Sequence, residues 1–208
     1  MARGRPRTFD ETEALDRALS VFWEKGYEGA SLADLTAAMG INRPSLYAAF
    51  GDKKGLFMRA LDRYLACPAA VTVEVIEGAA TAREAASALL HAMADNLTAC
   101  GRPKGCLAVH GALSCSSEGA DVARELARRR LDLELVLRRR FERAAAQGDL
   151  APGIAPEALA KFVATVAHGM GVQAKSGATA DELHAVASLA VAAWPPGRVG
   201  APPAAPAG

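Results

Sequence analysis

The sequence predicts an all-α protein, with an N-terminal three-helix domain that contains a helix-turn-helix and a larger helical C-terminal domain, about nine helices in all. Apolar residues recur three and four positions apart along most of the chain, which is the spacing of an amphipathic helix. Glycine and proline interrupt this pattern, and near the N-terminus the interruptions enclose two very short helices. A chain of 208 residues is long enough for one small and one medium domain.

The composition is that of an ordinary globular protein, with 51% hydrophobic and 23% charged residues and a net charge of +1. No apolar run reaches the length of about eighteen residues that a membrane span needs, and the N-terminus has no apolar core of a signal peptide. We therefore expect a cytoplasmic protein with no membrane partner. Four cysteines without an export signal indicate reduced thiols rather than a disulfide framework: Cys67, Cys100, Cys106 and Cys115.

The chain begins with a basic segment, residues 1–8, which contains three arginines and is expected to be a flexible arm. Such an arm reaches phosphates or a minor groove, or is simply a solvated tail. A first helix then begins at Thr8 or Asp10 and ends near Gly26. The apolar face of this helix consists of Leu15, Ala18, Leu19 and Phe22. It is the predicted scaffold of the small helix-turn-helix DNA-binding domain, which spans residues 9–52.

The first helix of the predicted helix-turn-helix begins at Ser31, a favourable N-cap residue. Asp34, three residues later, is placed to form a capping box with it. Gly40 stops this helix, and a second one begins at Asn42 or Arg43.

The second helix accommodates Pro44 in its first turn, where a missing amide costs little, and runs to about Phe50. Leu46 and Phe50 face inward, which leaves four residues outward: Arg43, Ser45, Tyr47 and Ala48. Two helices this short cannot bury a core of their own, so the second is expected to face an outside partner such as a DNA major groove. The alternative is an ordinary surface hairpin of helices.

The segment from Thr12 to Leu56 resembles the DNA-binding domain of the TetR (tetracycline repressor) family of bacterial regulators. The residues that carry the resemblance keep the order and spacing of the family: Ala18, Phe22, Gly26, Tyr27, Ser31, Ile41, Ser45, Leu46, Tyr47, Phe50, Lys53 and Leu56. Ala49 departs from it, since the family usually has histidine or tyrosine there.

The resemblance implies which residues contact DNA. It assigns phosphate contacts to Ser31, Tyr47 and Lys53, and base reading to the start of the second helix, at Arg43, Pro44 and Ser45. The implied partner is a double-stranded DNA operator.

Residues 53–194 form the predicted helical ligand-binding and dimerisation domain, and residues 195–208, rich in Pro, Gly and Ala, a disordered tail. Helices are expected from Asp52 to Pro68, from Thr81 to Gly101, from Gly105 to Ser116, from Ala120 to Gln147, from Pro156, and from a cap at Asp181. The long helix contains six arginines interleaved with acidic residues: Arg128, Arg129, Arg130, Arg138, Arg139 and Arg140. This pattern indicates a solvated, salt-bridged face, and a second nucleic-acid surface is the alternative.

The last two helices are small and apolar over wide faces, which favours packing against a second copy of the chain. The resemblance supports this homodimer, because TetR-family members pair through their final two helices; an intramolecular core is the alternative. The predicted interface residues are Phe162, Val166, Met170, Val186 and Ala190.

The resemblance also implies a small-molecule inducer, and the apolar segments of the larger domain suit a mostly apolar or aromatic one. The predicted pocket residues are Tyr64, Met93, Cys106, His110, Leu113 and Phe162. Three interpretations of Cys106 and His110 stay open: a zinc site with Cys100, an electrophile- or oxidant-sensing thiol, and, as the commonest case, small buried side chains of a core or pocket. We predict no metal and no cofactor.

These features predict a ligand-responsive transcriptional regulator, a repressor released from a palindromic operator by its inducer. A thiol-based sensor using Cys106 is the alternative. A small helical enzyme is more remote, because the sequence lacks the hydrolase, zinc-protease, nucleotide and dinucleotide motifs. A ligand-blind architectural DNA-binding protein would not need the larger apolar domain.

Overall fold

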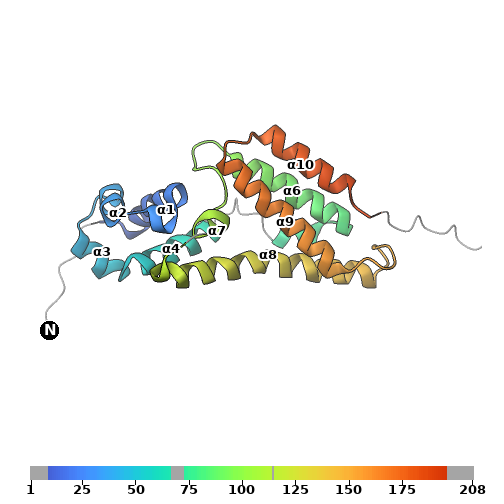
Figure 1. Ribbon diagram of the computed structural model, residues 1–208, viewed down its shortest axis with the longest axis horizontal. Helices are drawn as coiled ribbons and strands as arrows, with labels where there is room; N and C mark the ends of the chain where they lie inside the picture. The colour runs from blue at the N-terminus through green and yellow to red at the C-terminus, as the bar shows by residue number, and fades with distance from the viewer. Residues whose placement is uncertain (1–8, 67–72, 114, 196–208) are drawn as a thin grey trace, which may run out of the picture. The chain divides into compact units, whose positions relative to one another are not determined.

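The computed structural model describes residues 9–66, 73–113 and 115–195. The predicted basic arm, Cys67, and the tail beyond Pro195 lie outside these ranges. Within them the regular structure is ten α-helices and one short 3-10 helix, without strands, which confirms the all-α fold (Figure 1). The helices are α1 (Glu11–Gly29), α2 (Leu32–Met39), α3 (Arg43–Phe50), α4 (Lys53–Leu65), α5 (Val73–Gly78), α6 (Ala82–Thr98), α7 (Leu107–His110), η1 (Ser117–Gly119), α8 (Ala120–Ala146), α9 (Pro156–Lys175) and α10 (Ala180–Ala192).

The described residues form two compact units. The first unit contains those up to 66 and those from 99 to 130, and the second contains 73–98 and 131–195. The long helix α8 therefore contributes its first turns to the first unit and its remainder to the second.

Local capping signals set the helix ends of the first unit. Asp10, rather than Thr8, caps α1, because its carboxylate accepts from the backbone N–H of Thr12 at 2.7 Å. Ser31 and Asp34 form the predicted capping box of α2, with Asp34 N–H donating to Ser31 Oγ at 3.0 Å. Asn42, rather than Arg43, caps α3, accepting from Ser45 N–H at 2.9 Å.

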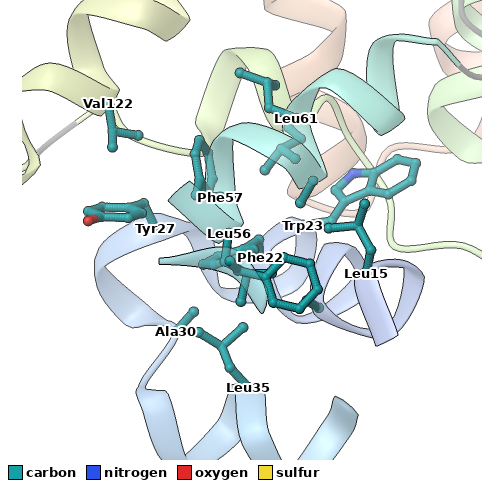
Figure 2. Close-up of a cluster of buried hydrophobic side chains, with 14 of the residues drawn as sticks. Leu15, Phe22, Trp23, Tyr27, Ala30, Leu35, Leu56, Phe57, Leu61 and Val122 are labelled. Atoms are coloured by element: carbon teal, nitrogen blue, oxygen red, sulfur yellow. The ribbon is translucent and has the colours of Figure 1, made fainter. Parts of the chain in front are cut away.

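Interlocking aromatic rings fill the core of the first unit (Figure 2). The edge of one ring meets the face of the next, with ring centroids 5.0 Å apart for Phe22 and Phe57 and 5.3 Å apart for Tyr27 and Phe57. Leu46 and Phe50 are buried in the same cluster, as predicted, so α3 is anchored by one face.

The second unit packs α6 beside α9 and α10 (Figure 1). Alanine dominates the buried faces of these three helices: Ala82, Ala85, Ala86, Ala94, Ala160, Ala164, Ala167, Ala174, Ala187 and Ala190. Small side chains let the helix backbones approach closely, but each buries little apolar area.

Three predicted helix limits differ from those of the structure. The helix expected from Gly105 to Ser116 is reduced to the single turn of α7, since Gly105 has a left-handed φ of 87° and the carbonyl groups of Gly105 and Gly111 accept hydrogen bonds from α1 instead. Thr179, not Asp181, caps α10, because its hydroxyl accepts from the Glu182 N–H.

The third concerns α1, in which Gly26, with a φ of 71°, interrupts the regular helix at the expected place. One more turn follows, to Gly29. A side chain at Gly26 would also crowd the carbonyl oxygen of Gly111, which lies 3.1 Å from the position of a Cβ.

Candidate nucleic-acid interface

Helix α3 presents one face to the core and the other to solvent. Arg43, Pro44 and Tyr47 are exposed, with 47% of Tyr47 accessible, and Ser45 is half-buried. The four residues lie together on one eight-residue helix, which agrees with the face predicted for DNA contact.

The other two candidate contacts flank α3. Ser31 is exposed at the start of α2, and Lys53 is the first residue of α4. The Lys53 ammonium lies 4.6 Å from the centroid of the Tyr27 ring, a cation–π contact that holds it beside the end of α3.

The position of α3 is fixed at both ends. Gly40 ends α2 with a φ of 69°, and Ile41 N–H then donates to the carbonyl oxygen of Thr36 at 3.2 Å. At the far end, Gly55 lets α4 pass close to α3, because a Cβ there would lie only 2.4 Å from the carbonyl oxygen of Phe50.

Arg59 is a positioning residue that the sequence did not reveal. Its guanidinium donates to the carbonyl oxygen of Ala49 at 3.1 Å and lies 4.7 Å from the centroid of the Phe50 ring. The side chain thereby closes the C-terminal end of α3. The contact spans ten residues and two helices, so helical periodicity could not predict it.

Acidic residues around the motif are largely engaged by basic ones. Lys25, 2.8 Å from Asp34, together with the hydrogen bonds from Ser31, lowers the pKa of Asp34 to about 2. The hydrogen bond from Arg63 lowers the pKa of Asp16, and the ion pair with Asp121 raises the pKa of Lys54. These pairings neutralise carboxylates that would otherwise repel a phosphate backbone.

Of the predicted pocket residues, three lie together in the first unit. Tyr64 donates from its hydroxyl to Cys106 Sγ at 3.4 Å, and its ring meets that of Trp23 at 4.8 Å. His110 Nε2 lies 2.9 Å from the carbonyl oxygen of Trp23. Burial raises the pKa of Tyr64, so its hydroxyl remains a neutral donor.

The remaining pocket candidates do not join this cluster. Leu113, also in the first unit, is 61% exposed. Met93 on α6 and Phe162 on α9 belong to the second unit. Of the described residues, no group of three or more His, Cys, Asp or Glu side chains could hold a metal ion. Nor does this part of the chain contain a helix long and apolar enough to cross a membrane.

The predicted dimer residues divide between the surface and the core of the second unit. Phe162 and Val186 are exposed and Val166 is half-buried, whereas Met170 is only 1% exposed and Ala190 is also buried within its own chain. Two exposed apolar residues on α9 and α10 were not predicted, Val172 and Leu189, and Leu189 is 71% accessible. For Leu189 the available signal was its helical spacing, since it lies three residues after the predicted Val186 in α10; no such spacing connects Val172 with a predicted residue of α9 that is exposed.

A short capped helix, anchored by Leu46 and Phe50 and exposed along its basic and aromatic face, defines a helix-turn-helix DNA-binding protein. Residues 14–60 match the family described as bacterial regulatory proteins, tetR family. The chain is 34% identical over 195 residues to the HTH-type transcriptional repressor ComR of Escherichia coli, covering 93% of each protein. It is 30% identical to the repressor BdcR of the same organism, covering 90% of each. The chain therefore belongs to the TetR family and is a DNA-binding transcriptional regulator.

Solved structures agree with this assignment. A cysteine mutant of the TetR family regulator CifR, complexed with 26-base-pair operator DNA, is 46% identical to the chain and superposes with a TM-score of 0.88. The match covers 92% of this chain and all of that one.

Proposed function

We propose that the protein is a homodimeric repressor that binds a near-palindromic operator through α3 of each copy and releases it when a small molecule binds. The observation that carries the proposal is the exposed face of α3, held in place by the buried Leu46 and Phe50. ComR and BdcR, which are similar along almost their whole length, are named repressors, and the CifR mutant is complexed with operator DNA.

Each DNA contact has a distinct role in this proposal. Tyr47, Lys53 and Ser31 bind phosphates and set the position of the motif, whereas Arg43, Pro44 and Ser45 contact base edges. Lys53 must leave the ring of Tyr27, or reach past it, to meet a phosphate.

The dimer is proposed to form through the exposed apolar residues of α9 and α10: Phe162, Val172, Val186 and Leu189. Exposed apolar side chains on two helices that pack together are typical of a protein interface. A two-fold dimer presents two copies of α3, which explains why the expected operator is palindromic.

Contacts inside the first unit give a ligand a route to α3. The backbone of Gly111 accepts from Tyr27 N–H at 2.7 Å, and Ser116 donates to the Glu28 carboxylate. The segment that follows α6 is thus bonded to α1, on which α2 and α4 pack. We propose that an inducer beside Tyr64, Cys106 and His110 shifts this segment, with Leu113 of the same unit as a further candidate contact. The ligand must favour one arrangement over the other for release to occur.

A thiol sensor at Cys106 is the second candidate for the same cluster. Cys106 is half-buried, and its Sγ accepts a hydrogen bond from the Tyr64 hydroxyl, which places a donor beside the thiol. The similar CifR structures are cysteine mutants, which directs attention to thiols in that protein. In either case the protein acts on cytoplasmic DNA and carries out no catalytic step.

Binding-site selection tests the proposal. DNA recovered from a random library by the full chain should contain an inverted repeat, bound by two copies of the protein. A Cys106→Ser variant then separates the two sensing modes: loss of release by electrophiles alone indicates a thiol sensor, whereas an altered response to unreactive ligands indicates a pocket wall. Recovery of no enriched sequence would contradict the proposed function.

A further inference from the structure

Arg140 is the buried charged side chain of the second unit. It lies in α8 and is only 3% exposed. The sequence placed it on a solvated face with the other arginines, and this prediction is wrong: Leu137 and Ala144, three residues before and four after it, are both fully buried, so Arg140 lies on the same inward stripe.

The guanidinium of Arg140 is only partly satisfied. Its Nη2 donates to the carbonyl oxygens of Ala79 and Ala80, at 3.1 and 3.4 Å. Its Nε and Nη1 are buried and have no hydrogen-bond partner. Because Nε carries one N–H group and Nη1 carries two, three of its five donors face no acceptor.

Such an arrangement is unfavourable by itself. The guanidinium group is a cation, and burying a cation without a counter-ion is strongly unfavourable. Carbonyl oxygens supply partial charge only. The arrangement makes sense if an anion occupies the site when the protein is loaded.

Two carboxylates of the neighbouring segments are engaged by other groups. Glu77 of α5 forms an ion pair with Arg143, one turn of α8 away from Arg140. Asp149, which follows α8, accepts from Ala82 N–H at 2.6 Å. Both groups therefore have other partners.

We propose that Arg140 binds the carboxylate of a small, otherwise apolar molecule. A single guanidinium among apolar side chains balances one negative charge, which favours a monoanionic carboxylate over a phosphate dianion. The inference does not depend on the inducer contacts proposed in the first unit.

The test measures which small molecules bind to the full-length protein. The panel contains straight-chain carboxylates from acetate to decanoate, phenylacetate, the uncharged primary amides of these acids, and inorganic phosphate. Thermal unfolding reports binding, because a ligand that prefers the folded state raises the midpoint. Tryptophan emission gives a second signal, since Trp194 packs edge-on against Phe141, the residue after Arg140, at 5.5 Å.

We expect at least one carboxylate to bind at least tenfold more tightly than its amide and than phosphate. Arg140→Leu should remove this binding, while the neighbouring Arg139→Leu, at an exposed position, should keep it. Without ligand, Arg140→Leu should be at least as stable as the parent, because it removes a buried unpaired charge.

Three results would overturn the proposal. The first is no binding of any carboxylate in the panel to the parent protein. The second is equal binding by Arg140→Leu. The third is a thermal unfolding midpoint that, without ligand, falls in Arg140→Leu and is restored in Arg140→Lys, while no carboxylate changes the midpoint of the parent. This result would make Arg140 a structural cap of the Ala79 and Ala80 carbonyls.

Discussion

The two units of the molecule bury their helices in different ways. The first unit packs large aromatic rings edge to face around Phe57, whereas the second packs α6, α9 and α10 largely through alanine. Both units also contain polar contacts between residues far apart in the chain. In the first, the Trp23 Nε1–H donates to the carbonyl oxygen of Gly105 at 2.9 Å, and in the second, the Ala82 N–H donates to the Asp149 carboxylate at 2.6 Å.

This difference suits a first unit that has to hold a DNA-reading helix in one position. Interlocked rings have one good arrangement, so they hold α3 in a fixed position relative to α1 and α4. Alanine faces interlock less, so neighbouring helices can shift with smaller steric penalties.

Replacing a buried ring in each unit tests whether only the core of the first unit holds α3 in position for DNA. Phe57→Ala and Phe141→Ala both remove fully buried rings and should each lower the free energy of unfolding by about 3 to 5 kcal/mol. Measured below the unfolding midpoint, operator affinity should fall for Phe57→Ala and change little for Phe141→Ala. Equal losses of affinity would show that the two cores do not have separate roles.

Charging the exposed apolar face of the second unit should separate the copies. Val186→Glu with Leu189→Glu places two carboxylates on a surface that is already accessible in the single chain, so the fold should survive. We expect monomers by sedimentation and a large loss of operator affinity, since each monomer then binds only one half-site. Arg83→Glu, at an exposed position of α6, changes the net charge by the same amount and is the matched control; a stable dimer of the double variant would place the interface elsewhere.

The helices and their caps could be predicted because their signals are local. The Ser31 and Asp34 box, the left-handed Gly40 and the Pro44 of α3 each lie within four residues of what they determine. The outward residues of α3 follow from the same periodicity, and Tyr64, Cys106 and His110 indeed lie together.

What the sequence did not reveal depends on contacts between distant segments. Arg59 meets the carbonyl of Ala49 only after α3 and α4 have packed, and α7 is cut to one turn because α1 uses the carbonyls of Gly105 and Gly111. Arg140 was misplaced for a different reason: a run of three arginines looks solvated unless the phase of the apolar stripe is followed through it.

Two capping boxes offer a matched pair of smaller perturbations. Ser31→Ala and Thr179→Ala each remove a hydroxyl that caps a helix, and each should cost about 1 kcal/mol of stability in chemical denaturation. Only Ser31→Ala should also weaken operator binding, because the proposed phosphate contact is lost with the cap. An equal effect of Thr179→Ala on DNA affinity would argue against that contact.

The carboxylates of these two boxes make the stability of the protein depend on pH. Hydrogen bonds from Lys25 and Ser31 lower the pKa of Asp34 to about 2, and those from Thr179 lower the pKa of Glu182. A carboxylate with a lowered folded pKa stabilises the protein above its unfolded pKa, near 4, and loses that contribution as pH falls. The stability difference between the parent and Asp34→Asn should therefore shrink between about pH 4 and pH 2. A difference that is independent of pH would refute the ion pair.

The central claim is that the outward face of α3 reads and holds DNA, and the most direct test is binding to a randomised operator library as a function of salt. Tyr47→Ala should weaken binding to all sequences alike, and Lys53→Ala should also reduce the salt slope by about 0.9, since one phosphate contact is lost. Arg43→Ala should instead relax preference at one base position, at a cost of about 1 to 3 kcal/mol. Unchanged selectivity of Arg43→Ala, together with an unchanged salt slope of Lys53→Ala, would contradict the account.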